Sequence, residues 1–169
     1  IGESEFIFTA NVDDWFYGRV TMAVEQEDND FSTSLEEAFL DTLSLPASTT
    51  LRFGRFYSSI GYLNDKHPHS WDFVDQALPY SALLDTQYGD DGIQLRWLAP
   101  TDLYLELGAE VFRGASYPAA GDAHSGKGTQ SLFGHIGGDV GISNSWTAGF
   151  SWLGSTARDR EYGNEDNPL

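Results

Sequence analysis

The clearest alternation of apolar and polar side chains in this chain is Leu103-Tyr104-Leu105-Glu106-Leu107-Gly108-Ala109-Glu110-Val111-Phe112. The odd-numbered positions are all apolar, whereas the even-numbered positions include both glutamates. Successive side chains of a β-strand point to opposite faces, so this run predicts a strand with one apolar face. The face that carries the glutamates must be wet or lined with opposite charges, because burying an unpaired carboxylate is too costly.

The same period of two recurs on both sides of this run. It predicts eight strands in four hairpins, over residues 5–12, 16–25, 37–42, 50–59, 93–98, 103–112, 132–142 and 146–152. The alternation slips at Gly54, since Arg52 and Arg55 cannot share a face of a regular strand. A β-bulge is therefore expected in the fourth strand.

The connections between these strands differ in length. Tight turns are expected near residues 13–14, 47–48, 100–101 and 143–144, and longer polar connections over 26–34, 60–91, 114–130 and from 157 onward. Short turns that alternate with long loops are typical of outer-membrane β-barrels. Aromatic residues near both sets of strand ends would form the two interfacial girdles of such a barrel: Trp15, Phe16, Trp97, Tyr104 and Trp146 at the turns, and Tyr57, Phe112 and Trp152 at the loops.

Length and charge limit the class of protein. The chain has 169 residues, which suits a single unit over 1–169 that carries one long loop over 60–91. Its formal net charge of -17 argues against nucleic acid as a partner, because phosphate backbones are bound by clustered lysine and arginine. Without cysteine, disulfide frameworks and thiolate metal sites are excluded. No run approaches the roughly 20 apolar residues of a membrane helix, but a β-barrel needs none.

A soluble antiparallel sandwich or jelly roll is the alternative, since strands and turns of this kind also occur there. In that class the apolar faces would form a core and the aromatic residues would be ordinary core residues. The matching function is a soluble all-β binding module for a metal ion or a carbohydrate.

Four stretches of the chain resemble Gram-negative outer-membrane porin-like proteins: Leu35–Asp41, Leu51–Phe56, His67–Asp75 and Asp90–Leu95. The resemblance covers about residues 36–114 and is to the phosphate-selective porin group and to uncharacterised barrels labelled zinc-regulated outer-membrane receptors. It implies an antiparallel up-and-down transmembrane β-barrel in the outer membrane of a Gram-negative bacterium. Such a protein admits small polar solutes or ions, or serves as a receptor in zinc uptake.

The partners implied by this resemblance are outer-membrane lipid, lipopolysaccharide, small polar solutes and further copies in a homo-oligomer. Phosphate selectivity has no support from the residues, since Lys66 and Lys127 are the only lysines and both fall in expected loops. The first strand leads into a short turn and the last into a long-loop-type tail, and no aromatic residue ends the chain. We therefore expect an internal fragment of a larger barrel.

Charged residues on the strand faces opposite the apolar ones are the candidates for a pore lining. They are Arg19, Glu37, Asp41, Arg52, Arg96, Glu106, Glu110 and Asp139. In a barrel they would line the lumen and set its electrostatic field. The simpler interpretation is that they pair across strands, with Glu37 or Asp41 opposite Arg52.

The loop over 60–91 carries the candidate metal ligands His67, His69 and Asp72, with Asp65 and Asp75 nearby. Imidazole and carboxylate groups can bind Zn²⁺, and carboxylates alone suit Ca²⁺, although no cofactor is required by the sequence. The alternative is a loop whose polar groups bond to one another, anchored by Trp71, Phe73 and Leu78. A short helical turn is expected over Tyr80–Leu84.

The sequence gives no sign of an enzyme. There is no nucleophile elbow, and His135 has no identifiable partner in the sequence. Glu106 and Glu110 could act as the paired carboxylates of a glycosidase. A lumen lining explains them with fewer assumptions.

Overall fold

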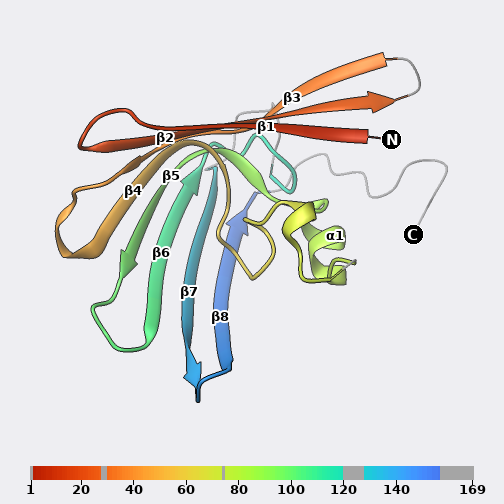
Figure 1. Ribbon diagram of the computed structural model, residues 1–169. Helices are drawn as coiled ribbons and strands as arrows, with labels where there is room; N and C mark the ends of the chain where they lie inside the picture. The colour runs from red at the N-terminus through yellow and green to blue at the C-terminus, as the bar shows by residue number, and fades with distance from the viewer. Residues whose placement is uncertain (1, 28–29, 74, 120–127, 157–169) are drawn as a thin grey trace.

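Eight β-strands, arranged side by side in chain order, form the computed structural model of this protein (Figure 1). The structure describes residues 2–27, 30–73, 75–119 and 128–156, so the expected tail over 158–169 lies outside it. The strands are β1 (Gly2–Asn11), β2 (Phe16–Glu27), β3 (Asp30–Thr42), β4 (Thr49–Tyr57), β5 (Gly89–Leu98), β6 (Tyr104–Phe112), β7 (Thr129–Val140) and β8 (Asn144–Ser155).

Each strand pairs with the next in antiparallel fashion, which confirms the expected all-β, up-and-down architecture. The sheet is strongly curved: β1, β2 and β3 lie across the top of Figure 1, and β4–β8 curve downward from them. Within the described residues, β1 and β8 are edge strands that do not pair with one another. The sheet is therefore open and is not a closed barrel.

The predicted tight turns are confirmed at 12–15, 43–48, 99–103 and 141–143. In the first of them, the Oδ1 atom of Asp13 accepts the backbone N–H groups of Trp15 (2.7 Å) and Phe16 (2.9 Å). The long connection expected over 26–34 is wrong, because β2 and β3 remain paired as far as Glu27 and Asp30. An acidic run is solvated as well on an exposed strand end as in a loop, so its charge does not distinguish the two.

The two faces of the sheet have opposite chemistry. We call the face that contacts residues 58–88 the inner face; its polar side chains are at most 8% exposed at Thr21, Glu37, Asp41, Gln94, Glu110, Thr129 and Ser131. The outer face exposes large apolar side chains, namely Phe8, Val20, Phe53, Ile93, Leu95, Leu107, Val111, Leu132, Phe150 and Trp152. This distribution is the reverse of that in a water-soluble domain, which buries apolar area when it folds.

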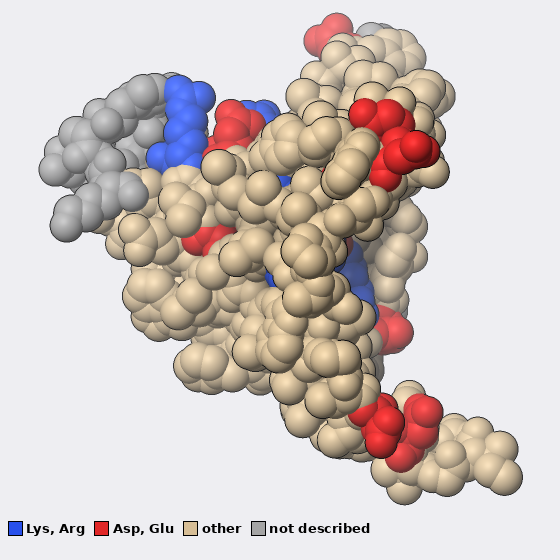
Figure 2. All heavy atoms as spheres, turned by 90° about the vertical axis from the view of Figure 1, so that its left-hand side faces the viewer, with Lys and Arg blue, Asp and Glu red and all other residues tan. Residues whose placement is uncertain are grey.

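The surface shown in Figure 2 is formed mostly by uncharged residues, and the acidic groups lie mainly toward its margins. A chain with a formal net charge of -17 thus has few charged groups in the middle of this face. Most of the acidic residues in the strands lie on the inner face, and Glu37, Asp41 and Glu110 are examples.

A β-bulge is present, but not where the sequence predicted it. The ladder between β4 and β5 runs without a shift from Thr49 to Tyr57, and Gly54 fits it with a φ of 128°. The register instead shifts between β2 and β3, where Thr21 pairs with Glu37 and Met22 with Leu35. Glu36 is the extra residue of this bulge.

A small apolar core lies between the inner face and the long loop. It is formed by Phe39, Phe56, Ile60, Leu84, Tyr88 and Phe112. Phe112 is only 2% exposed, so its assignment to an outer aromatic girdle was wrong. By contrast, Trp97, Trp146 and Trp152 are exposed, as a girdle requires.

The loop between β4 and β5 contains the 3-10 turn η2 (Pro68–Ser70) and the helix α1 (Leu78–Leu84), which includes the helical turn expected over Tyr80–Leu84. A further 3-10 turn, η1 (Pro46–Ser48), precedes β4. Among the described residues, no helix has the length and apolar character to cross a membrane.

Candidate functional site

The long loop over residues 58–88, which we call the inner loop, is closed at its neck by Asn64. The Asn64 side chain is fully buried; it donates to the carbonyls of Ser58 (2.7 Å) and Tyr88 (2.8 Å) and accepts the Tyr88 N–H (2.7 Å). Ser58 N–H also donates to the Tyr88 carbonyl at 3.0 Å. One amide side chain therefore forms hydrogen bonds with backbone groups at both ends of the loop.

Glu110 fixes the inner loop to the middle of the sheet. Its side chain is 1% exposed and accepts hydrogen bonds from the Ser59 N–H (2.9 Å), the Gln94 amide (2.6 Å) and the hydroxyls of Ser58 and Ser131. A buried carboxylate needs hydrogen-bond donors of this kind to offset the cost of its burial. Glu110 is thus a docking group for the loop, which the pore-lining prediction did not include.

The inner loop also contacts both edge strands of the sheet. At one end, Gly61 N–H donates to the Ser151 hydroxyl of β8 at 2.9 Å. At the other, the Nδ1 atoms of His67 and His69 each lie 3.4 Å from Oε1 of Glu5 in β1. The inner loop therefore reaches from one edge strand of the sheet to the other, and the sheet curves around it.

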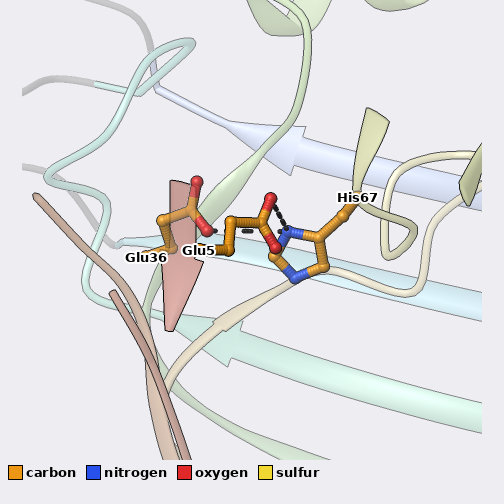
Figure 3. Close-up of side chains that lie close together, drawn as sticks. All are labelled: Glu5, Glu36 and His67. Carbon is orange, nitrogen blue, oxygen red and sulfur yellow. Dashed lines mark ion pairs between the residues drawn. The ribbon is translucent and has the colours of Figure 1, made fainter. Parts of the chain in front are cut away.

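His67 is the centre of the densest group of charges on the inner face. Glu5 comes from β1 and Glu36 from the bulge in β3 (Figure 3). Glu37 is the next residue of β3. The Nδ1 atom of His67 lies 3.4 Å from Glu5 Oε1 and 3.5 Å from Glu36 Oε2, and its Nε2 atom lies 3.3 Å from Glu37 Oε2. The bulge allows two consecutive glutamates to reach the same imidazole, which a regular strand would forbid.

These carboxylates favour a positive charge at this position. The hydrogen bond with Glu37 raises the pKa of His67 above its usual value, against the opposing effect of burial, and the charges of Glu5, Glu37 and Glu36 act in the same direction. Arg19 also lies at this point, with Nη2 3.3 Å from Glu37 Oε2.

The predicted pore-lining residues lie on the inner face, and most of those in the middle of the strands are paired. Arg52 forms two bonds to Asp41, at 2.7 and 2.8 Å, as the cross-strand interpretation expected, and Arg96 lies 3.4 Å from the same carboxylate. Glu106 lies 3.7 Å from Nδ1 of His135, so His135 has the partner that the sequence did not reveal. Asp139, near the end of β7, is exposed.

The predicted metal ligands divide into two groups. His67 and His69 lie together, with ring centroids 5.8 Å apart, and both face Glu5. Asp72 instead accepts the Tyr62 hydroxyl at 2.5 Å and lies 3.8 Å from Lys66 Nζ. Among the described residues, the group whose ligand atoms could share a metal ion is Glu5, Glu36 and His67.

Glu5 and Glu36 were not among the metal ligands that the sequence predicted. One signal for Glu36 was available: Leu35 and Ala38 are apolar residues three positions apart, and a strict period of two cannot place both on one face. No comparable signal identifies Glu5, which meets His67 only because the inner loop crosses to the edge of the sheet.

The predicted hydrophobic anchors of the loop are partly wrong. Phe73 and Leu78 are 72% and 76% exposed, whereas Trp71 is half-buried and donates its Nε1–H to the Lys66 carbonyl at 2.9 Å. The loop is instead held by the hydrogen bonds of Asn64 and Glu110 and by the apolar core around Ile60, Leu84 and Tyr88.

Asp90 was not predicted as a functional residue from the sequence. It holds the second long connection, which joins β6 to β7. It is 1% exposed, and its Oδ2 atom accepts the N–H groups of Gly114 (2.8 Å), Ala115 (2.7 Å) and Ser116 (3.3 Å). Buried carboxylates thus attach both long connections to the sheet.

Comparisons with known proteins give little guidance on function. No protein-family model matches this chain, and no solved structure matches it. The chain is similar to an uncharacterised protein of Aquifex aeolicus (strain VF5), with 37% identity over 111 residues. That match covers 66% of this chain and 23% of the relative, so the chain spans less than a quarter of the relative it matches.

Proposed function

We propose that this chain is part of an outer-membrane β-barrel that admits small polar solutes or ions along its inner face. The observation that carries the proposal is the inversion of the two faces, with exposed apolar side chains outside and buried polar ones inside. Lipid is the solvent that such an outer face suits, since strands of membrane barrels alternate apolar-out and polar-in.

Closure would require strands beyond the eight described. The free backbone groups of β1 and β8 cannot remain unpaired in lipid, because no water is there to satisfy them. The uncharacterised relative is more than four times as long as the stretch that matches, which leaves ample chain for further strands. In a larger barrel the inner loop would narrow the lumen from one wall.

The charges of the inner face give the proposed passage its character. Arg52 and Arg96 share the carboxylate of Asp41, and Glu106 is paired with His135. These paired groups leave local dipoles along this part of the passage. This arrangement favours small polar solutes or ions over a strongly selected anion.

The test begins with the full-length protein in bacterial membranes. We expect it to fractionate with the outer membrane, to need detergent for extraction and to change gel mobility on heating. In planar bilayers it should give discrete conductance steps. Recovery from the soluble fraction without detergent and without heat-modifiable mobility would instead favour a soluble all-β binding module.

A further inference from the structure

A second property of the inner face is independent of solute passage. Glu5, Glu36 and His67 offer one ligand atom each within 4.8 Å of one another, and His69 adds an imidazole 3.4 Å from Glu5. His67 is 7% exposed, and within the described residues its Nδ1 atom has no hydrogen-bond partner although it faces both carboxylates. A buried nitrogen left in this state needs an explanation.

The spacing of these atoms is better suited to a shared ion than to direct hydrogen bonds. A charge-assisted N–H···O bond is about 2.7–2.9 Å long, whereas the His67–Glu5, His67–Glu36 and His69–Glu5 separations are 3.4, 3.5 and 3.4 Å. Ligands placed tetrahedrally about 2.1 Å from a zinc ion lie about 3.4 Å from each other. The His67–Glu5 and His67–Glu36 separations have the length of tetrahedral edges.

The surroundings of His67 already orient it as a metal ligand. Its Nε2 atom lies 3.3 Å from Glu37 Oε2, so Glu37 can hold the proton on Nε2 and leave the Nδ1 lone pair toward Glu5 and Glu36. A carboxylate behind a ligating imidazole is the usual second layer of a zinc site. The Tyr57 ring, perpendicular to the imidazole at 5.6 Å, limits its rotation.

The charge balance points to a divalent cation. Glu5, Glu36 and Glu37 contribute three negative charges, and Arg19 offsets one of them. Because a histidine that binds a metal ion is neutral, two negative charges remain for the ion to neutralise. Imidazole nitrogen together with carboxylate oxygen suits Zn²⁺ and related transition metals, whereas Ca²⁺ prefers oxygen ligands only.

We propose that Glu5, Glu36 and His67 bind a divalent transition-metal ion of the zinc class. The ion would join the inner loop to β1 and β3. Glu37 is a positioning residue that acts through His67. The sequence-based ligand set changes accordingly, because Glu5 and Glu36 replace His69 and Asp72.

The experiment is calorimetric titration of ZnCl₂ into the full-length protein in detergent, beside variants of this chain. We expect His67→Ala and the near-isosteric Glu36→Gln to weaken Zn²⁺ binding at this site at least about tenfold. Glu37→Gln should weaken it by about 10–100-fold, as losses behind a ligating histidine do. The matched control is His135→Ala, which removes a histidine of the same face that is paired with Glu106.

Circular dichroism of each variant separates loss of the site from loss of the fold, and Glu36→Gln keeps the test decisive if His67→Ala fails to fold. Absence of Zn²⁺ binding by the wild type, or equal binding by wild type, His67→Ala and Glu36→Gln, would overturn the proposal. So would Ca²⁺ binding as tight as that of Zn²⁺. None of these readouts depends on conductance, so the metal site and the channel can fail separately.

Discussion

Three buried carboxylates each attach a different part of the chain to the sheet. Glu110, Asp90 and Glu37 are each at most 5% exposed, and each is surrounded by donors from a different part of the chain. Such groups are costly to bury, and removing their donors or their charge exposes the full cost. The inner loop and the second long connection therefore depend on residues that lie in strands.

Replacing Glu110 by Gln tests this dependence. An amide would direct N–H hydrogens at donors that now point to a carboxylate, so we expect unfolding in detergent to become easier by about 3 kcal/mol. Amide exchange of residues 58–64 should also accelerate. Glu106→Gln is the control on the same strand and face, with a more exposed side chain near His135. Equal effects of the two substitutions would refute the docking role of Glu110.

At the scale of elements, the path of β4 beside β3 depends on Gly54. Its φ of 128° is outside the range of other residues, and an added Cβ would meet the carbonyl oxygen of Ala38 and lie 2.8 Å from Phe39 Cα. These are backbone atoms of β3, which cannot move aside as the end of a flexible side chain can. Gly141 also has a positive φ, 72°, but a Cβ there would meet nothing within 4 Å.

Alanine at these two glycines should therefore have unequal effects. We expect Gly141→Ala to cost about 1 kcal/mol, from backbone strain alone, and Gly54→Ala to cost clearly more, about 3 kcal/mol. Denaturant or thermal unfolding in detergent measures both. If the two substitutions lower the free energy of unfolding equally, the close contact between β3 and the β4 backbone at Gly54 does not constrain the fold.

Most strands and the tight turns of the described residues could be predicted because their signals are local, whereas the first half of β3 was expected to be a loop. Alternation from Leu103 to Phe112 and turn residues such as Asp13 act over a few positions. The neck at Asn64, the docking of Glu110 and the meeting of Glu5 with His67 could not be predicted. Each joins residues far apart in sequence, and a period of two reveals the face of a residue but not its partner across the sheet.

If lipid surrounds the sheet, a charged side chain should destabilise the protein when it is placed on the outer face but not when it is placed on the inner face. Leu107 and Thr147 are both exposed strand residues, the first on the outer face and the second on the inner. We expect Leu107→Lys to lower the stability of the membrane-inserted protein by about 2–4 kcal/mol, with Thr147→Lys nearly neutral. Equilibrium folding into lipid vesicles measures the difference. In a soluble domain both changes would lie within about 0.5 kcal/mol.

The central claim is that the outer face contacts lipid, and spin-label accessibility in vesicles addresses it directly. This chain has no cysteine, so single cysteines can be labelled one at a time once any cysteine elsewhere in the full-length protein is replaced. Labels at Leu95, Leu107 and Leu132 should be relaxed by oxygen, which concentrates in lipid. Labels at Glu106 and Thr147 should respond instead to a water-soluble nickel chelate. Nickel-accessible labels at the three leucines would contradict a lipid-facing sheet.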